Sequence, residues 1–280
     1  MATALQLERH GIRSLIIEQG RVGGLLLNAN LVENYPGFPG GIAGPELVDL
    51  FKDQVKSYNL RFYEARLENL DYTNDQFEFS VNGKLLRSRL AVIASGTIPR
   101  KLTEFNLPAE IQNKVYYEVY PLLDVIGKQI AIVGAGDAAF DYALNLAPDN
   151  DIFIFNRGDK ISSLPLLWER AQLIPRIHYH QETAITQIIA GPDERISLEC
   201  KTLTASSGYI VDYLIGAIGR EPNLDFISGQ FVEKAIQLEN SGKLHYVGDV
   251  VNGLFRQTAI AVGNGILAAM KIYKYLKENE

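Results

Sequence analysis

The chain has 280 residues, enough for two domains that each bury a hydrophobic core. Its single cysteine, Cys200, excludes an internal disulfide, and a formal net charge of -6 without a basic tract argues against a nucleic-acid partner. The N-terminal segment carries Glu8, Arg9 and His10 where a signal peptide needs an apolar core, and no apolar run reaches membrane-spanning length, so we expect a cytoplasmic protein without a membrane span.

Residues 1 to 20 have the pattern of a helix followed by a strand that ends at an acidic residue, Glu18. These are the second and third elements of a nucleotide-binding βαβ unit, in which Glu18 would accept hydrogen bonds from a ribose diol. The first strand of such a unit and its GxGxxG turn are not among the printed residues. We expect either that the natural chain begins upstream of Met1 or that another segment or subunit supplies this strand.

Three apolar runs end in glycine, at 14–20, 90–96 and 129–136. Buried parallel strands have this pattern, because they are covered on both faces and lead into ligand loops at their carboxyl ends. Between the first two runs the chain alternates apolar with polar residues and turns at Asn82-Gly83, which predicts an antiparallel flap. A second hairpin-like region is expected over residues 177–219.

The stretch "IVGAGDAAFDYAL" predicts a phosphate-binding turn. Gly134 would permit the tight turn, Gly136 would let a backbone approach a pyrophosphate, and Ala139 would allow close packing of helix on strand. The alternative is an ordinary strand-to-helix turn. The next strand, "DIFIFN", ends at Asn156 and Arg157, which could accept a 2′-phosphate, so NADP is favoured over NAD; alternatively, Arg157 is a solvated strand-end arginine.

The C-terminal segment predicts a short strand that ends at Gly248-Asp249, then a loop, then a long helix from about Gln257. Gly263 and Gly265 lie inside this helix, where glycine lowers stability, so we expect close packing against a neighbour. His178 and His180 could share a strand face, but no third ligand is near and no metal site is expected. Asp137 and Asp141 have the positions of helix-capping and surface groups.

In the order in which they occur, "VENYPGFPGGIAGPEL", "VIASGTIPRKL", "IVGAGDAAFDYAL", "GAIGREPN" and "YVGDVVNGLFRQTAIAVGNGILAAM" resemble the flavin-dependent pyridine nucleotide-disulfide oxidoreductases. The chain is most similar to thioredoxin reductases and to the ferredoxin-NADP reductases of the same plan. The resemblance implies an α/β fold with two Rossmann-like three-layer (ββα) nucleotide-binding domains. An NAD(P)-binding domain, 113–216, would be inserted into a discontinuous FAD-binding domain, 1–112 and 217–280.

The resemblance also implies cofactor contacts. Those with FAD would involve Glu18, Gly24, Asn34, Gly96, Gly248, Asp249, Arg256, Gln257 and Thr258. Those with NAD(P) would involve Gly134, Gly136, Ala139, Asn156, Arg157 and Gly219. Asp249 could accept a hydrogen bond from a ribityl hydroxyl or lie near the flavin phosphate, and the helix that starts near Gln257 would stabilise negative charge on the flavin.

The chain departs from the family pattern at the redox-active dithiol. Thioredoxin reductases of the family carry Cys-x-x-Cys shortly before the NAD(P)-binding strand, and the matching tetrad here is "YEVY", Tyr117 to Tyr120. The two tyrosines could shield the flavin or could be ordinary strand aromatics. Leu25 stands where many relatives have glutamine, and Gly158 leaves half of the usual 2′-phosphate clamp missing.

These observations predict an FAD-dependent NAD(P)H oxidoreductase in which no side chain beyond the flavin carries the chemistry. The electron acceptor would lie outside the chain, with ferredoxin or flavodoxin as the leading case and a specialised disulfide or lipoyl-type substrate as an alternative. A second alternative is a non-catalytic homologue that acts as a binding protein. A homodimer is the habit of the family.

Overall fold

The computed structural model describes residues 1–279 and separates into two compact units. Unit 1 contains Met1–Leu27, Val32–Ile98 and Glu221–Glu280, and unit 2 contains Asn28–Leu31 and Pro99–Arg220. Apart from the short segment Asn28–Leu31, the chain passes from one unit to the other inside two short strands that pair with each other, β7 (Thr97–Pro99) and β16 (Arg220–Pro222). Unit 2 is therefore an insertion in unit 1.

The expected domain boundaries, after residue 112 and before residue 217, both lie inside unit 2. The loop that follows β7 belongs to unit 2 because Leu102 and Ile111 pack in one core cluster with Ala131. At the other boundary, the Arg100 N–H donates to the Gly219 carbonyl over 3.0 Å. Packing of this loop was not visible as a periodic pattern in the sequence.

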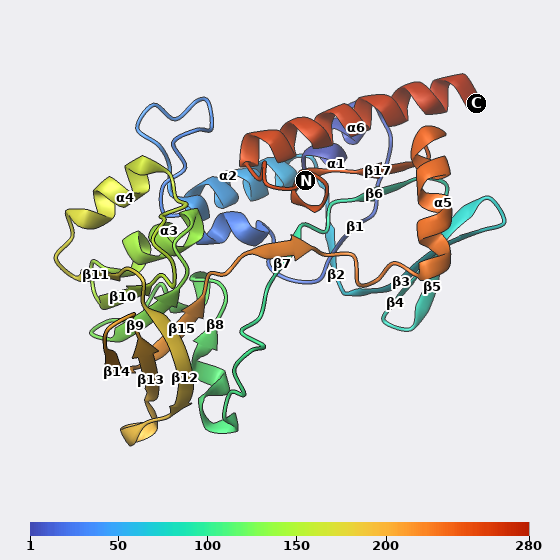
Figure 1. Cartoon of the computed structure of the whole chain (residues 1–280). Coiled ribbons are helices and arrows are strands. Elements are labelled where there is room, and N and C mark those ends of the chain that lie inside the picture. The colour runs from blue at the N-terminus through green and yellow to red at the C-terminus, as the bar shows by residue number, and fades with distance from the viewer. Residues whose placement is uncertain (280) are drawn as a thin grey trace. The chain divides into compact units, whose positions relative to one another are not determined.

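Unit 2 is built on a parallel five-stranded sheet with the strand order β11-β10-β9-β15-β8 (Figure 1). Its strands are β8 (Val115–Tyr116), β9 (Gln129–Val133), β10 (Asp151–Phe155), β11 (Ile177–His180) and β15 (Tyr213–Gly216). A second, antiparallel sheet contains β12 (Ala184–Ala190), β13 (Ile196–Lys201) and β14 (Ser206–Val211). The expected hairpin region at 177–219 is thus only partly correct, because its two ends join the parallel sheet.

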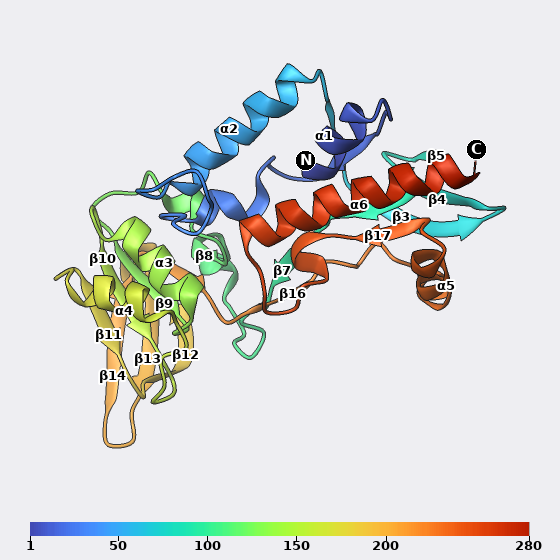
Figure 2. The same ribbon diagram turned by 90° about the horizontal axis from the view of Figure 1, so that it is seen from above.

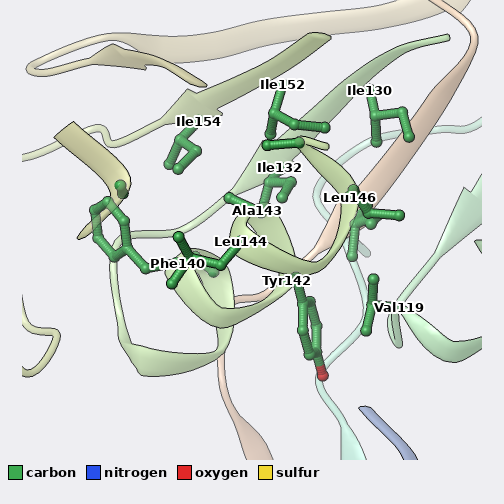
Figure 3. Packing of buried hydrophobic residues seen from close by; sticks show 14 of the residues in the cluster. Val119, Ile130, Ile132, Phe140, Tyr142, Ala143, Leu144, Leu146, Ile152 and Ile154 are labelled. Carbon is green, nitrogen blue, oxygen red and sulfur yellow. The ribbon is translucent and has the colours of Figure 1, made fainter. Parts of the chain in front are cut away.

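The parallel sheet of unit 2 is covered on both faces. Ile130 and Ile132 of β9 pack against helix α3 (Asp137–Leu146), and Figure 3 shows them beside Ala143 and Leu146. Ala131, between them in sequence, packs on the opposite face in the cluster that contains the antiparallel sheet. This alternation explains the continuous apolar run of β9, since both faces of a parallel strand are buried. A further helix, α4 (Pro165–Gln172), packs against α3.

Unit 1 contains two parallel strand pairs and an antiparallel flap. The pairs are β1 (Ile16–Glu18) with β2 (Phe62–Glu64) and β6 (Ala91–Ile93) with β17 (Leu244–Tyr246). The flap contains β3 (Leu67–Thr73), β4 (Gln76–Val81) and β5 (Lys84–Ser88). The predicted turn between β4 and β5 is confirmed, because Asn82 and Gly83 both have a positive φ, 50° and 69°.

The helices of unit 1 are α1 (Ala2–Arg9), α2 (Gly44–Ser57), α5 (Gly229–Asn240) and α6 (Thr258–Asn279). Helix α6 lies alongside α1 (Figures 1 and 2). A β-carbon at Gly265 would lie 2.9 Å from Thr3 Oγ1 and 3.2 Å from the Thr3 nitrogen, so the expected close packing is confirmed there. At Gly263 no atom lies within 4 Å of such a carbon, and the expectation is wrong at that position.

Five short 3-10 helices complete the described chain, and several carry predicted site residues. They are η1 (Gly24–Asn28), η2 (Ala109–Lys114), η3 (Tyr120–Leu122), η4 (Pro192–Glu194) and η5 (Gly248–Val250). Within residues 1–279, no helix is both long and apolar enough to cross a membrane.

Candidate functional site

The β9–α3 turn of unit 2 has the backbone expected of a phosphate-binding turn. Gly134 has a φ of 132°, and a β-carbon there would lie 2.4 Å from the Ala217 carbonyl oxygen, so only glycine fits against the end of β15. Gly136 precedes α3 with extended backbone, and Ala139, in the first turn of α3, is fully buried. The turn and the first N–H groups of α3 can therefore receive a diphosphate.

The side chain of Asn156, at the start of the loop after β10, is held by hydrogen bonds within the protein. It is 8% exposed; its amide donates to the Lys160 carbonyl over 3.0 Å and to the Tyr179 hydroxyl over 2.8 Å, and its oxygen accepts from the Gly158 N–H over 3.1 Å. These bonds use both amide hydrogens of Asn156, so this side chain shapes the loop. Arg157 beside it is exposed and is the cation that remains available for a 2′-phosphate.

Tyr117 of the YEVY tetrad is a wall of the unit 2 core. Its hydroxyl accepts from the Leu102 N–H over 3.1 Å, and its ring fills the space above Gly216, where a β-carbon would lie 2.8 Å from Cε1. The neighbouring Glu118 accepts from Arg220 over 3.1 Å, an ion pair that is only 15% exposed on the arginine side. Tyr117 therefore packs in the core of unit 2.

Tyr120 lies at the start of η3, where its backbone meets the short segment Asn28–Leu31. The Tyr120 N–H donates to Asn28 Oδ1 over 2.9 Å, and the Asn145 amide of α3 donates to the Asn28 carbonyl over 2.9 Å. Asn28 is 4% exposed. Sequence reasoning overlooked Asn28, because nothing near it in the sequence indicates a partner so far along the chain.

Asp141 was expected to be a capping or surface group, and this expectation is wrong. Gly136 is the N-cap residue of α3, while Asp141 is half-buried and accepts from the Asn30 N–H over 3.1 Å. Burial raises the pKa of Asp141 to about 6, the Asn30 hydrogen bond opposes this shift, and the charge of Asp137 adds to it. Asp137 lies in the first turn, where its carboxylate accepts from the Leu164 N–H over 2.7 Å.

In unit 1, Asn34 and Gln257 are brought together although they are 223 positions apart in the sequence. Asn34 Nδ2 donates to Gln257 Oε1 over 2.7 Å, directly before the first residue of α6, Thr258. The helix thus begins where the sequence predicted, at about Gln257. The first N–H groups of α6 present a partial positive charge beside this amide pair, and Arg256 immediately precedes Gln257. The arrangement suits an acceptor-rich ligand edge.

Gly24 and Gly96 both have a left-handed backbone, with φ of 52° and 66°, and no atom lies within 4 Å of a β-carbon built on either. Gly248, the first residue of η5 after β17, has a φ of 75° and would place a β-carbon 3.4 Å from Ala261 of α6. Asp249 follows it in η5, as the predicted strand-end motif requires. Open space beside two such glycines fits the approach of a cofactor to the backbone.

Glu18 ends β1, where its carboxylate accepts from the Gly20 N–H over 3.0 Å. This bond leaves carboxylate lone pairs for a ribose diol. Gly219 of unit 2 has a φ of 104° and accepts from the Arg100 N–H, so its conformation serves the connection between β15 and β16. All residues predicted to contact FAD lie in unit 1, and all residues predicted to contact NAD(P) lie in unit 2.

The Cys200 thiol and the two histidines of β11 are the other candidate reactive groups. Cys200 of β13 is 1% exposed, and burial raises its pKa to about 11, so its thiol is not a reactive one. Over the part of the chain that the structure describes, no group of three His, Cys, Asp or Glu side chains is placed to hold a metal ion. His178 and His180 instead stack on Phe153.

Comparison with known proteins identifies a family and solved structures that this chain resembles. The sequence profile of a family described as pyridine nucleotide-disulphide oxidoreductase matches residues 1–265. The thioredoxin reductase of Mycolicibacterium smegmatis is 27% identical over 301 residues, which cover 99% of this chain and 93% of that protein. The crystal structure of Lactococcus lactis thioredoxin reductase superposes with a TM-score of 0.85 at 24% identity and covers 99% of this chain and 95% of its own.

A second solved structure, thioredoxin reductase of T. acidophilum, gives a TM-score of 0.83 at 23% identity over 98% of this chain and 93% of that one. At this level of identity the structural likeness establishes the fold. It confirms the predicted α/β architecture of two Rossmann-like domains with parallel sheets.

Proposed function

Because this chain belongs to the pyridine nucleotide-disulphide oxidoreductase family and is an oxidoreductase of the thioredoxin reductase type, we propose that it uses FAD in unit 1 and NAD(P)H in unit 2. The electrons would pass to an acceptor outside the chain. The observation that carries the proposal is the hydrogen bond between Asn34 and Gln257 at the start of α6, since it joins two residues that the motifs independently assign to FAD.

The FAD site would use the backbone of Gly24, Gly96 and Gly248 for close approach and the carboxylates of Glu18 and Asp249 for hydroxyl groups. The N-terminus of α6, with Arg256, Gln257 and Thr258, would face the part of the ring that gains negative charge. Bound FAD would supply two-electron chemistry between a nicotinamide and the acceptor. The chain itself supplies binding, orientation and electrostatic stabilisation.

The NAD(P)H site would use the turn from Gly134 to Ala139 for the diphosphate and Arg157 for the adenosine ribose end. Arg157 is exposed and pairs with no carboxylate within residues 1–279. A guanidinium at this position supports a 2′-phosphate, so NADPH is the proposed donor and NADH the alternative.

The acceptor we propose is a small electron carrier, ferredoxin or flavodoxin, which a flavin can reduce directly. The relatives named above are thioredoxin reductases, but the printed sequence has one cysteine and that thiol is buried with a raised pKa. A relay through a dithiol of residues 1–280 is therefore excluded. A specialised disulfide or lipoyl-type substrate that meets the flavin itself is the second candidate acceptor.

We also propose a cytoplasmic homodimer. Helix α6 exposes Leu267 and Met270, at 52% and 54%, one turn apart on the same face, and an apolar stripe of this kind favours association of copies. Light scattering coupled to size-exclusion chromatography would show a mass of twice 31.2 kDa. A monomer at micromolar concentration contradicts this part of the proposal.

A non-catalytic binding protein is the rival function, and the replacement of the dithiol by Tyr117 and Tyr120 is the observation that favours it. The decisive experiment is the visible spectrum of the purified chain after reconstitution with FAD, followed by anaerobic addition of NADPH and then NADH. We expect an oxidised-flavin spectrum that bleaches faster with NADPH. A flavin that stays oxidised with both nucleotides supports the binding protein.

Turnover with ferredoxin, flavodoxin, thioredoxin, lipoamide and a quinone would then identify the acceptor. The Cys200→Ala variant is a suitable control, because a buried thiol should not contribute to any of these rates. Reduction of thioredoxin at a rate comparable to that of ferredoxin would contradict the proposed acceptor while leaving the FAD and NAD(P)H assignments intact.

A further inference from the structure

A shallow pocket of about 290 Å³ lies within unit 2, beside the YEVY tetrad. The loop that follows β7, helix η2 and Tyr117, the residue directly after β8, form it. None of the residues assigned to FAD or NAD(P) lines this pocket. It is thus separate from both proposed cofactor sites in its residues.

The floor and one wall of the pocket are apolar and fixed. Leu102 is 1% exposed, and Phe105 and Leu107 are half-buried in the same core cluster. The ring of Tyr117 is held at two points, by the hydrogen bond from the Leu102 N–H to its hydroxyl and by its contact above Gly216. A flat apolar molecule can therefore pack here without a cost in ordering the protein.

A cation covers one face of the Tyr117 ring. Lys101 Nζ lies 3.9 Å from the centre of the Tyr117 ring, and within residues 1–279 it forms no ion pair and no hydrogen bond with another side chain. A cation held on an aromatic face keeps its charge and its donors for a third group. An anion placed here would meet a positive charge that the rest of the described chain leaves uncompensated.

Two further polar groups line the pocket and are also available. The side chains of Thr103 and Asn106 make no hydrogen bond with any described residue, whereas the Gln112 amide is engaged, since its Nε2 donates to the Leu107 carbonyl over 3.1 Å. The hydroxyl and the carboxamide can each donate to an oxygen of a ligand. Apolar walls with a few convergent polar groups are typical of small-molecule sites.

From these contacts we infer that the pocket beside Tyr117 binds a small planar aromatic carboxylate. The carboxylate would lie on the Lys101 ammonium, beside the Tyr117 ring that this ammonium covers, and the ligand ring would pack on the apolar floor of Leu102 and Leu107. The volume of the pocket fits a molecule of one or two rings. This inference stands on unit 2 alone and does not depend on the proposed acceptor or on either cofactor.

The test uses the full chain labelled with 3-fluorotyrosine and the probe 2-naphthoate, with neutral 2-naphthamide as its match in shape. One of the 14 tyrosine resonances should shift in a saturable way with 2-naphthoate, and the Tyr117→Phe variant should identify it by its loss. We expect the amide to bind at least about tenfold more weakly, the size of effect typical for one charge-assisted contact.

Charge variants complete the test. Lys101→Met should raise the dissociation constant of 2-naphthoate about tenfold, and Lys101→Arg should keep it within about threefold of wild type. Lys84→Met is the matched control, because Lys84 is also an exposed lysine without an ion pair in the described chain and lies on the flap of unit 1. Equal binding of the acid and the amide, unchanged affinity of Lys101→Met, or an unmoved Tyr117 resonance would each overturn the inference.

Discussion

A β-carbon added to Gly134 would lie 2.4 Å from the carbonyl oxygen of Ala217 and 3.0 Å from its carbonyl carbon. Both neighbours are backbone atoms at the end of β15, so neither can rotate away. At Gly136, two residues further on, the nearest atom is Ser162 Oγ at 3.6 Å, an ordinary contact distance. The two glycines of one motif therefore serve different purposes.

This contrast predicts opposite behaviour for two similar variants. Gly134→Ala should lose about 2 to 4 kcal/mol of unfolding free energy because of the clash and the unfavourable φ. The unfolding free energy of Gly136→Ala should lie within about 1 kcal/mol of the wild-type value. This variant should nevertheless bind NADPH at least about tenfold more weakly, if a diphosphate approaches this backbone. Urea denaturation and nucleotide titration measure the two effects. Equal stability of the two variants would contradict the packing argument, and unchanged NADPH affinity of Gly136→Ala would contradict the phosphate site.

In the loop after β10, Asn156 has a structural role, whereas Arg157 is expected to set nucleotide specificity. Asn156→Ala should destabilise the protein by about 2 kcal/mol, because the Gly158 N–H, the Lys160 carbonyl and the Tyr179 hydroxyl all lose a partner. Arg157→Ala should instead leave stability unchanged and raise the KM for NADPH about tenfold, with the KM for NADH unaffected. Steady-state kinetics with both nucleotides check this. A parallel rise in both KM values would show that Arg157 does not contact a 2′-phosphate.

The Asn34–Gln257 pair can be tested by a double-mutant cycle on FAD affinity. Asn34→Ala and Gln257→Ala should each weaken FAD binding about tenfold. The double variant should bind FAD no more weakly than the single variant with the lower affinity, since each change removes the same contact. Fluorescence quenching of added FAD provides the measurement. Gln54→Ala, an exposed change on α2, serves as the control. Additive losses would mean that the two side chains act separately.

Asp141 gives unit 2 a predictable dependence on pH. Its pKa is raised to about 6 in the folded chain by burial, while in the unfolded chain it stays near 3.8, so the folded state binds the proton more tightly. This contribution to stability is fully present below pH 3.8 and is lost as the pH rises through 6. Asp141→Asn should therefore be more stable than wild type by about 1 to 3 kcal/mol at pH 7.5.

The advantage of Asp141→Asn should shrink to about a third of that value at pH 4.5, where most of the folded wild type is already protonated. Urea denaturation at the two pH values measures both differences. Asp149→Asn, at an exposed position after α3, should match wild type at both. A stability difference that does not change with pH would refute the assignment of the shift to Asp141.

Much of the fold could be predicted because its signals are local. The alternation before and after Asn82-Gly83 predicts the flap, and the apolar run before Gly134 predicts a buried parallel strand. Helix α5 was not predicted, although Ser228 caps it by accepting from the Phe231 N–H over 3.2 Å. Strand β11 was assigned to a hairpin, because a short apolar segment has the same pattern in a parallel and in an antiparallel sheet.

Part of the candidate site could also be predicted from the sequence. The tight turn at Gly134 was predicted from its motif, and Gly24, Gly96 and Gly248, which the family resemblance assigns to FAD, also have a positive φ.

Sequence alone thus determined the flap turn at Asn82-Gly83, the buried parallel strand before Gly134 and the long C-terminal helix, and it shows that residues 1–280 contain no dithiol. Tertiary structure alone decided that Asn156 serves its own loop, that Asp141 is half-buried, and that Asn34 meets Gln257. The reason is physical: a backbone conformation depends on neighbours in sequence, whereas the partner of a side chain and its exposure to water depend on residues that only folding brings near.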